Sequence, residues 1–517
     1  MISSISSQVI VTASQMQAIE SLIFQSGMPV AALMEKVALK IVQQMDQLYP
    51  AHKFPKVGIL VGSGHNGGDA LVVARELYHQ GRQVKVCSMM PKAKPLTRVH
   101  TCHAKAIGIP FVSLTDLQDC DLLVDGIFGF GLERDVDGDL ALSFNLINSW
   151  QIPILAIDLP SGLNCDRGHV MGAAICATHT LCLGLWKRGL LIEQALPYIL
   201  PYIGILERID FDIPEQFIME VLGDRHPLWR VDPHTCLRQY LPIPRPIAVH
   251  KYNLGYLLLV VGSQRYAGAA ILAALGAKAT GVGMLSIAVP SSLKLLVLAQ
   301  VPDALVIDCP ETDSGAIYSL AGLDLQKYQA IVCGCGLSLN ASSVVKQAID
   351  SDIPLVLDAD GLNAISPLAD PNFIHQLQGR TNPIIFTPHG GEFNRLFPEL
   401  MAGDRLDALM AAVELCHATI LLKGARTMIS FLQDQKPVLW VNPESTPALA
   451  RGGSGDVLAG MIGGLLAQGL SASDSAIVAT VWHSQAAISL ANQRSIMGVD
   501  PVSLAHHLLP FLLPAVS

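Results

Sequence analysis

The sequence predicts an α/β protein built from two three-layer domains, in each of which helices cover both faces of a sheet. Three observations predict this. The 517 residues are too many for one hydrophobic core, and hydrophobic residues make up 51% of them against 15% charged residues. Short apolar runs alternate with longer segments of helical periodicity, which is the order of strands and crossover helices in parallel sheets. This alternation fades once, between residues 197 and 246, where prolines cluster. We therefore place the domains at 1–225 and 226–517.

The first domain is predicted to open with helical sequence over residues 12–48, in which apolar residues recur at helical spacing. Strands and helices then alternate. Strands are expected at Lys56–Val61, Gln83–Met89, Asp121–Asp125 and Ile152–Ile157, and helices at Ala70–Gln80 and near Arg98–Ile107. Because the carboxyl ends of parallel strands meet at one edge of a sheet, we expect the functional residues of this domain at that edge.

The second domain is predicted to contain another alternating series, from Gly255 to about residue 490. Its first strand is Tyr256–Val261, and a helix rich in small residues follows and runs through Ala279. Later strands are expected to end at Cys333, Leu357, Phe386 and Leu422, and a helix is expected over Val457–Gln468. The residues that follow these strands again fall at one edge of a sheet.

Composition limits the partners of the chain. A net charge of -9 argues against nucleic acid as a partner, because binding to a phosphate backbone requires a basic face. No apolar run approaches the roughly 20 residues of a membrane span, and no export signal precedes the first helix. The 11 cysteines are scattered without a CxxC pair, which is typical of reduced thiols. We expect a cytoplasmic homo-oligomer that acts on small molecules.

A glycine-rich segment at residues 62–69, Gly-Ser-Gly-His-Asn-Gly-Gly-Asp, follows the first predicted strand and leads into a helix. Backbone N–H groups and the helix dipole create an anion-binding site in this setting. The segment matches GxGxxG, but a dinucleotide fingerprint also needs a carboxylate at the end of the next strand. That strand ends in Cys87–Pro91, without a carboxylate, and no GK[ST] follows the glycines. Neither a standard dinucleotide fingerprint nor a P-loop is therefore predicted.

Two further strand ends carry polar residues that should converge on this segment. Asp125 ends an apolar strand and precedes a glycine-rich loop, and Asp158 and Ser161 follow the next strand. An isolated aspartate at a strand end usually caps a turn. Two of them beside an Asn-Gly-Gly-Asp segment favour a binding or catalytic site.

Together these segments resemble the NAD(P)H-hydrate epimerase family, and the resemblance extends to the N-terminal helices. It implies a Rossmann-like domain that interconverts the R and S forms of NADHX and NADPHX, the nicotinamide cofactors hydrated at C6. It also implies a potassium ion held by Asn66, Asp125 and Ser161, with Asp125 as a catalytic acid–base group. The residues that the resemblance places on the substrate are His65, Asn66, Gly67, Gly68, Asp69, Gly129, Phe130, Gly131, Leu132, Glu133, Arg134 and Asp158.

A second glycine-rich segment, Arg451–Asp456, precedes the predicted helix Val457–Gln468. Glycine amides at a helix start neutralise the oxyanions of phosphoryl transfer, and Asp456 is placed to take a proton from an attacking hydroxyl. Lys423 and His389 follow other strands of the same series. In isolation Lys423 is also consistent with a solvated charge at a strand end, and His389 is typical of a packed turn histidine, but their occurrence with the Gly-Ser-Gly-Asp segment favours a second site.

This half resembles the ADP-dependent NAD(P)H-hydrate dehydratases, a branch of the ribokinase-like fold, over about Pro242 to Leu490. The resemblance implies that ADP phosphorylates the C6 hydroxyl of the S-hydrate and that loss of phosphate restores NADH or NADPH, with a magnesium ion on the phosphates. Asp456 is the implied catalytic base. The implied hydrate contacts are Ala269, Gly336, His389 and Asp456, and the implied AMP contacts are Lys423, Gly424, Ala425, Arg426, Thr427 and Gly455.

The combined interpretation is a bifunctional repair enzyme, in which the epimerase supplies the S form that the dehydratase consumes. One alternative makes the second domain a kinase of a small molecule, because Gly-x-Gly-Asp serves such kinases too. Another makes the first domain a nucleotide-binding regulatory or scaffolding module. The preference between ADP and ATP and that between NADHX and NADPHX stay open from the sequence.

Overall fold

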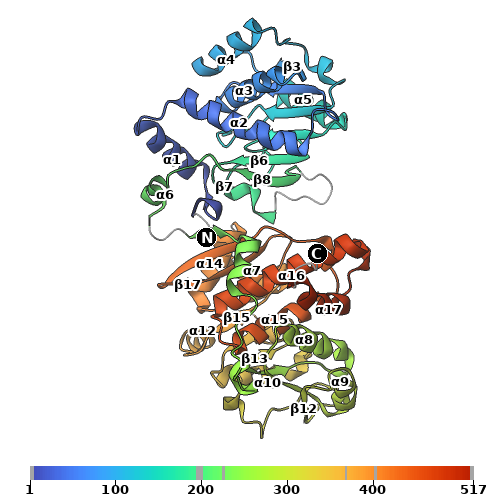
Figure 1. Cartoon of the computed structure of the whole chain (residues 1–517). Helices are drawn as coiled ribbons and strands as arrows, with labels where there is room; N and C mark the ends of the chain where they lie inside the picture. Colours follow the sequence, from blue (N-terminus) through green and yellow to red (C-terminus); the bar gives the residue numbers. More distant parts are fainter. Residues whose placement is uncertain (1–4, 194–201, 224–226, 367–369, 401–403, 513–517) are drawn as a thin grey trace. The chain divides into compact units, whose positions relative to one another are not determined.

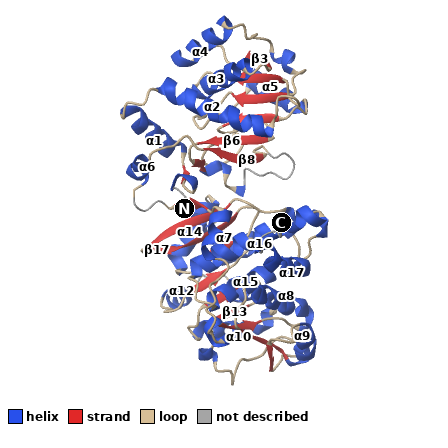
Figure 2. Ribbon diagram, viewed as in Figure 1, coloured by secondary structure: helices blue, strands red, loops and turns tan. Residues whose placement is uncertain are grey.

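The computed structural model of the chain describes residues 5–193, 202–223, 227–366, 370–400 and 404–512. Its contacts divide the chain into two compact units, Met1–His226 and Pro227–Ser517. The predicted boundary at residue 225 and the prolines at 197 and 201 lie outside the described residues. Figure 1 follows the chain through both units, and Figure 2 shows that strands and helices alternate in each. The predicted α/β class is confirmed.

The first unit is built on a six-stranded sheet with the strand order β3-β2-β4-β5-β6-β8, in which all neighbours are parallel. The strands are β2 (Lys56–Val61), β3 (Gln83–Ser88), β4 (Leu122–Gly126), β5 (Ile154–Ile157), β6 (His179–Leu183) and β8 (Ile205–Ile209). A separate parallel pair joins β1 (Ile10–Val11) to β7 (Trp186–Lys187). The order reverses between β2 and β4, so their carboxyl ends border the crevice where open α/β sheets bind ligands.

Helices cover both faces of this sheet, as predicted. α3 (His65–His79) packs on β2 and β4 and is covered in turn by α2 (Val30–Leu48). The cluster on the other face combines Phe144 and Ile147 of α5 (Gly138–Ser149) with Leu123 and Ile154. The remaining helices of the unit are α1 (Ala13–Gln25), α4 (Pro95–Ala106) and α6 (Glu215–Leu222).

One feature of the first unit differs from the sequence prediction. α3 begins at His65 rather than Ala70, so residues 65–69 form the first turn of the helix instead of a loop. The glycines suggested an irregular loop from the sequence. In the structure Gly67 and Gly68 are helical and buried, and neighbouring atoms already occupy the space that a side chain would need at either position. The proline-rich stretch was compatible with strand and helix at the edge of the first domain, and it contains β8 and α6 here and the first elements of the second unit.

The second unit contains a ten-stranded sheet with the order β12-β11-β10-β13-β14-β15-β16-β17-β18-β9. The strands are β9 (Leu228–Arg230), β10 (Tyr256–Val260), β11 (Met284–Pro290), β12 (Leu305–Cys309), β13 (Ala330–Cys333), β14 (Leu355–Leu357), β15 (Ile384–Phe386), β16 (Thr419–Leu422), β17 (Thr427–Gln433) and β18 (Lys436–Asn442). The strands from β12 to β16 are parallel, as predicted, and β17 pairs antiparallel with both neighbours. Residues 423–426 therefore form the turn that leads back into the sheet.

One face of this sheet is covered by α8 (Ala267–Ala279), α15 (Ser454–Ala467) and α16 (Ala472–Arg494), whose buried residues form one cluster with those of the strands. α14 (Arg405–Cys416) contacts β16, β17 and β18 but contributes no residue to that cluster, so it covers the opposite face. The other helices are α7 (Pro233–Tyr240), α9 (Lys294–Gln300), α10 (Ser342–Asp350), α11 (Asp360–Ala364), α12 (Pro371–Gln378), α13 (Gly390–Leu396) and α17 (Pro501–Leu512).

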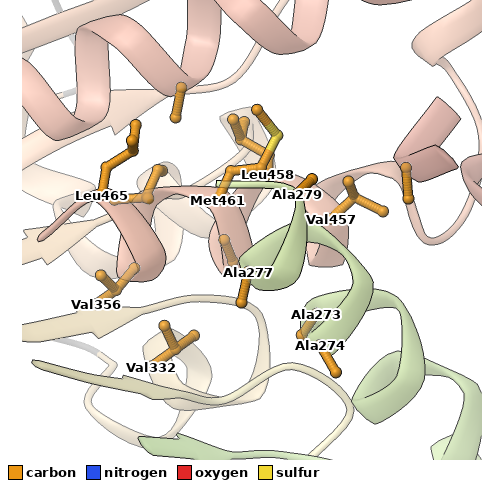
Figure 3. Packing of buried hydrophobic residues seen from close by; sticks show 14 of the residues in the cluster. Ala273, Ala274, Ala277, Ala279, Val332, Val356, Val457, Leu458, Met461 and Leu465 are labelled. Carbon is orange, nitrogen blue, oxygen red and sulfur yellow. The ribbon is translucent and has the colours of Figure 1, made fainter. Parts of the chain in front are cut away.

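The contact between α8 and α15 is unusually close because small residues face each other across it. Figure 3 shows Ala273 and Ala277 of α8 beside Val457 and Met461 of α15. A Cβ atom on Gly460 would lie 2.0 Å from the carbonyl oxygen of Ala273, and one on Gly276 would lie 2.1 Å from that of Val457. The two backbones therefore touch directly, and α15 is fixed in the turns that follow its glycine-rich start.

Gly460→Ala is expected to lower the free energy of unfolding of the second unit by about 1–3 kcal/mol, because the added methyl forces the two backbones apart. Gly268→Ala, in α8, is the matched control, since a Cβ there meets nothing within 4 Å. Urea unfolding followed by tryptophan fluorescence measures both variants. Equal unfolding midpoints for the two would contradict this account of the helix contact.

Within the described ranges, no single helix is both long and apolar enough to cross a membrane. Only α1 and α2 taken together reach the required length and composition, and they meet at a bend of 118°.

Candidate active sites

The start of α3 in the first unit is held tightly against the ends of β2 and β4. The Gly62 N–H donates to the Gly126 carbonyl oxygen (3.2 Å), and a Cβ atom on Gly62 would lie 1.8 Å from the carbonyl oxygen of Ile127. A Cβ on Gly67 would lie 2.2 Å from the Gly62 carbonyl oxygen. Only glycine fits at these two positions. The helix N-terminus, with its unpaired N–H groups, is thereby brought to the crevice beside β4.

Asp125 and Ser161 form a buried hydrogen-bonded pair at this crevice. Ser161 Oγ donates to Asp125 Oδ1 (2.6 Å) and accepts from the Phe128 N–H (2.8 Å). The N–H groups of Ser161 and Ile127 also donate to the carboxylate, at 2.8 and 3.1 Å. Burial raises the pKa of Asp125 to about 6, although the hydrogen bonds from Ser161 and Ile127 oppose the rise. Within the described residues this carboxylate, which is 0% exposed, has no ion-pair partner.

Asp158 is paired instead with a lysine. Lys187 Nζ lies 2.6 Å from Asp158 Oδ1, with the two side chains 1% and 5% exposed, and also donates to the Leu183 carbonyl oxygen. The N–H groups of Phe130 and Leu183 donate to the same carboxylate, at 3.2 Å each. Asp158 has a φ of +70°, which a non-glycine residue adopts at a cost of about 1–3 kcal/mol. Strained residues of this kind cluster at functional sites.

Two more carboxyl groups lie within electrostatic range of Asp158. Burial raises the pKa of Asp69 well above its usual range, and the charges of Glu20 and Asp158 raise it further. Burial likewise raises the pKa of Glu20 to about 7, with Lys187 opposing and Asp158 reinforcing the shift. Burial alone would lower the pKa of Lys187, but the carboxylate of Asp158 outweighs it and raises that pKa. The pKa of Glu20 thus lies near neutral pH, and that of Asp69 is raised in the same direction.

Several of the predicted residues meet at this crevice, and others do not. Asn66 Nδ2 donates to the Ile157 carbonyl oxygen (3.2 Å). A Cβ on Gly129 would lie 3.1 Å from Asp158 Oδ2 and 3.4 Å from Asn66 Cγ, so these three positions adjoin. Desolvation, and then the charge of Lys94, lower the pKa of His65, although its side chain is exposed. The last residues of the predicted loop are solvent-facing, namely Gly131, Glu133 and Arg134, whereas Leu132 packs on the core around α5.

The sequence analysis missed Lys187 and Glu20. Lys187 follows β6 in β7, and a lone lysine among apolar residues gives no motif. Glu20 lies in α1 among the residues of a helical pattern, where an acidic residue normally faces solvent. Complete burial of Lys187 (1% exposed) depends on the pairing of β7 with β1, which no local pattern reveals.

The second site is centred on Asp358, which follows β14. Lys423 Nζ and Thr387 Oγ1 both donate to Asp358 Oδ1, each at 2.7 Å. Asp358 is 2% exposed, so its charge is neutralised by the lysine inside the protein. The Cys335 thiol and a carboxylate oxygen each of Asp358 and Asp456 lie within 4.8 Å of one another. Burial and the charge of Asp358 raise the pKa of Asp456 to about 7, although Cys335 and Lys423 oppose the shift.

The glycine-rich start of α15 leaves room beside these groups. Gly453 has a φ of +97°, and α15 begins at the next residue, with Asp456 in its first turn. A Cβ on Gly455 would lie 3.5 Å from Lys423 Nζ. The structure thus places an acid, a lysine and the open amides of a helix N-terminus together, the arrangement expected for phosphoryl transfer.

The predicted hydrate contacts lie along neighbouring strand ends. Gly336 has a φ of +60°, and a Cβ there would lie 2.7 Å from Cβ of Ala269, so these two positions adjoin. His389 Nδ1 accepts from the N–H groups of Gly391 (3.0 Å) and Glu392 (3.3 Å) and thereby caps α13. His389 thus caps α13 with a side chain that is 55% exposed, and its backbone pairs with that of Lys423 in an isolated parallel β-bridge.

The turn that contains the predicted AMP contacts joins β16 to β17. Thr427 Oγ1 donates to the Gly424 carbonyl oxygen (3.1 Å). Burial, together with repulsion from Arg230, lowers the pKa of Arg426 to about 10. The sequence analysis gave no role to Asp358, Thr387 or Cys335, although the string that follows β14, Asp-Ala-Asp, was a usable signal.

The group of Cys335, Asp358 and Asp456 does not fit magnesium. A thiol is a poor ligand for a hard cation, and Lys423 already neutralises Asp358. In contrast, the oxygens at Asp125 fit a hard monovalent cation, since the Ser161 hydroxyl lies beside this buried carboxylate and no cationic side chain among the described residues forms an ion pair with it. Ser161 Oγ also lies 3.4 Å from the Phe128 carbonyl oxygen.

Comparisons with known proteins agree on both halves. Residues 257–510 match the NAD(P)H-hydrate dehydratase family model, and residues 30–189 match the model of the YjeF-related protein N-terminus. The bifunctional NAD(P)H-hydrate repair enzyme Nnr of Thermosynechococcus vestitus is 49% identical over 98% of both chains. The enzyme of the same name from Synechocystis sp. is 47% identical over 97% of this chain and 94% of its own length.

Among solved structures, an ADP/ATP-dependent NAD(P)H-hydrate dehydratase from Bacillus subtilis, co-crystallised with ATP and Mg²⁺, is 28% identical. It covers 54% of this chain and 96% of its own, with a TM-score of 0.45. The two full-length relatives decide the assignment, because their similarity spans both units and both glycine-rich segments. The chain belongs to the family of bifunctional NAD(P)H-hydrate repair enzymes.

Proposed function

We propose that this chain repairs hydrated nicotinamide cofactors with two activities, one in each unit. The first unit interconverts the R and S epimers of NADHX and NADPHX. The second unit uses ADP to dehydrate the S epimer to NADH or NADPH, giving AMP and phosphate. The observation that carries the proposal is the presence of two separate strand-end sites, each with a carboxyl group whose pKa is raised by burial, to about 6 in Asp125 and about 7 in Asp456.

In the first unit, the proposed acid–base group is Asp125, at the mouth formed by the α3 N-terminus. Asn66, Asp125 and Ser161 would hold a potassium ion, which would neutralise the buried carboxylate and orient the hydrate. Among the predicted substrate contacts, Asn66 and Gly129 adjoin Asp158 at this crevice, whereas Gly131, Glu133 and Arg134 face solvent. Asp158, which is paired with Lys187, would accept a hydrogen bond from the amide or a ring hydroxyl of the substrate.

In the second unit, Asp456 is the proposed base. It accepts the proton of the C6 hydroxyl as that oxygen attacks the β-phosphorus of ADP and AMP leaves. Phosphate then leaves C6 while a proton leaves C5, which restores the reduced nicotinamide. The amides at the start of α15 stabilise the transferred phosphoryl group, and Lys423, which is paired with Asp358, lies beside them. Magnesium would be carried largely by the phosphates of ADP, since the described side chains offer no oxygen cage for it.

The experiment that tests the proposal supplies purified R- and S-NADPHX to the full-length protein, with and without ADP. Without ADP, each epimer should convert to the mixture of both, as resolved by chromatography. With ADP and magnesium, the S epimer should disappear as NADPH absorbance and AMP appear in equal amounts. A stable phosphorylated product without NADPH would reveal a kinase instead, and absence of epimerisation would leave the first unit as a binding module.

The dehydratase should depend on pH through Asp456. A base acts only when unprotonated, and the pKa of Asp456 is raised to about 7. Below pH 7 the active fraction falls about tenfold per pH unit, and above pH 7 it is constant. We therefore expect kcat/KM for the S-hydrate to rise with a slope of one up to about pH 7 and then to level off. A profile already flat from pH 5 upwards would contradict the assignment of Asp456 as base.

A further inference from the structure

A surface cleft in the first unit carries only positive charge. It lies where β3 and β2 end, and its lining includes Ser63, Met90, Lys92, Lys94 and Arg134. No carboxylate contributes to the lining. Within the described residues the three cationic side chains have no ion-pair partner, and all three are exposed. A cleft with unneutralised cations is a site for an anion.

The cleft is fixed to the glycine-rich turn. The Lys94 N–H donates to the Ser63 carbonyl oxygen (2.9 Å), and the Met89 N–H donates to the Val61 carbonyl oxygen (2.9 Å). The loop that follows β3 is therefore held against the start of α3. The charge of Lys94 also reaches His65, in the first turn of that helix, and contributes to lowering the pKa of His65. The cleft and the proposed epimerase site are thus neighbours that meet at the α3 N-terminus.

The position of the cleft in the sheet identifies the part of a dinucleotide that reaches it. In a parallel sheet with a glycine-rich first turn, the pyrophosphate lies on the helix N-terminus and the adenosine ribose lies at the end of the next strand. Here that next strand is β3. A carboxylate at its end binds the 2′-hydroxyl of an unphosphorylated ribose, whereas a basic residue accommodates a 2′-phosphate. β3 is followed by Met89-Met90-Pro91-Lys92-Ala93-Lys94, which supplies two lysines and no acid.

We propose that this cleft, through Lys92, Lys94 and Arg134, binds the 2′-phosphate of the substrate, so that the epimerase unit prefers NADPHX to NADHX. The inference rests on the proposed function and assigns its substrate. Asp125 and Asp158, on the other side of β2, then face the hydrated nicotinamide, and the α3 N-terminus between them faces the pyrophosphate. The single dinucleotide spans β3, β2 and β4 in that order, which is their order in the sheet.

The test compares the two hydrates as epimerase substrates of the full-length protein without ADP, so that the dehydratase is idle. The wild type should show a higher kcat/KM for R-NADPHX than for R-NADHX. Lys92→Gln and Lys94→Gln should each lower the ratio of the two values about tenfold, and the double variant more, since each removes one charge-assisted contact. The preference should also weaken as salt is raised, because exposed charges are screened.

Lys53→Gln is the matched control. Lys53 is exposed but precedes β2, at the opposite end of the strands, and its replacement should leave the ratio within about twofold. An equal loss for both hydrates in the Lys92 and Lys94 variants would assign the cleft to the pyrophosphate and overturn the proposal, as would an unchanged ratio. Failure of the wild type to epimerise either hydrate would instead refute the proposed function.

A second test uses only the wild-type protein, so its result does not depend on whether the lysine variants fold. Adenosine 2′,5′-bisphosphate should inhibit epimerisation of R-NADHX at least about tenfold more strongly than 5′-AMP, because only the former reaches the cleft with a phosphate. Equal inhibition by the two nucleotides would contradict a 2′-phosphate site.

Discussion

Asp456→Asn is expected to lower the ADP-dependent formation of NADPH from S-NADPHX by two to four orders of magnitude, the range contributed by a positioned general base. The amide keeps the size of the carboxylate but cannot accept the hydroxyl proton. It also removes a buried negative charge beside Asp358, so the packing of the α15 start should survive. The rate of NADPH absorbance increase at saturating ADP measures the loss, and KM for ADP should change little.

Asp434→Asn provides the control for this variant. Asp434 is exposed in the turn between β17 and β18, and its φ of +49° suits asparagine as well as aspartate. The control should dehydrate at the wild-type rate, and both variants should keep full epimerisation. If Asp456→Asn retained more than a tenth of the wild-type rate, another group would have to take the proton.

Asp125→Asn is expected to lower epimerisation of R-NADPHX by at least about a hundredfold while leaving dehydration of the S epimer intact. The variant removes both the proposed acid–base group and the charge that would bind potassium. The N–H groups of Ser161 and Ile127 donate to different oxygens of Asp125, so the single amide oxygen keeps one of these hydrogen bonds and loss of the other costs about 1–3 kcal/mol of stability. Chromatographic separation of the two epimers, without ADP, measures the rate.

The companion control is Asp137→Asn, at the exposed start of α5, where the side chain makes no capping hydrogen bond. It should epimerise normally. Residual epimerisation by Asp125→Asn that still responds to potassium would contradict the placement of the ion at Asp125. Unchanged epimerisation would instead transfer the acid–base role to the neighbouring carboxyl groups, Glu20 and Asp69.

The sequence predicted the parallel strands because buried strands are nearly continuous apolar runs, and each predicted strand from Lys56 to Ile157 lies within about two residues of an observed one. The residues that end them, such as Asp125 and Asp158, were therefore placed correctly at one edge. The antiparallel β17 and β18 gave no such signal, because their faces are unequally buried and the turn before β17 was interpreted only through its motif.

The missed residues depend on contacts between segments far apart in the chain. Asp358 is recognisable as a partner only when β14 and β16 are known to lie two strands apart, which brings Lys423 to it. Lys187 is buried only because β7 pairs with the N-terminal β1. Local sequence patterns predict which residues follow the carboxyl ends of the strands. Which of these residues form ion pairs depends on the order of the strands in the sheet, which the sequence patterns do not give.

The backbone contact between α8 and α15 has a consequence for turnover. Ala269 and Asp456 lie in the first turns of α8 and α15. Because the backbones of these two helices are in direct contact, we expect this side of the second site to stay rigid during turnover. Admission of the hydrate and departure of AMP must then be accommodated by the opposite wall, the β16–β17 turn with its Lys423 and the start of α13. Slow steps in the dehydratase cycle should accordingly be sensitive to substitutions in that turn.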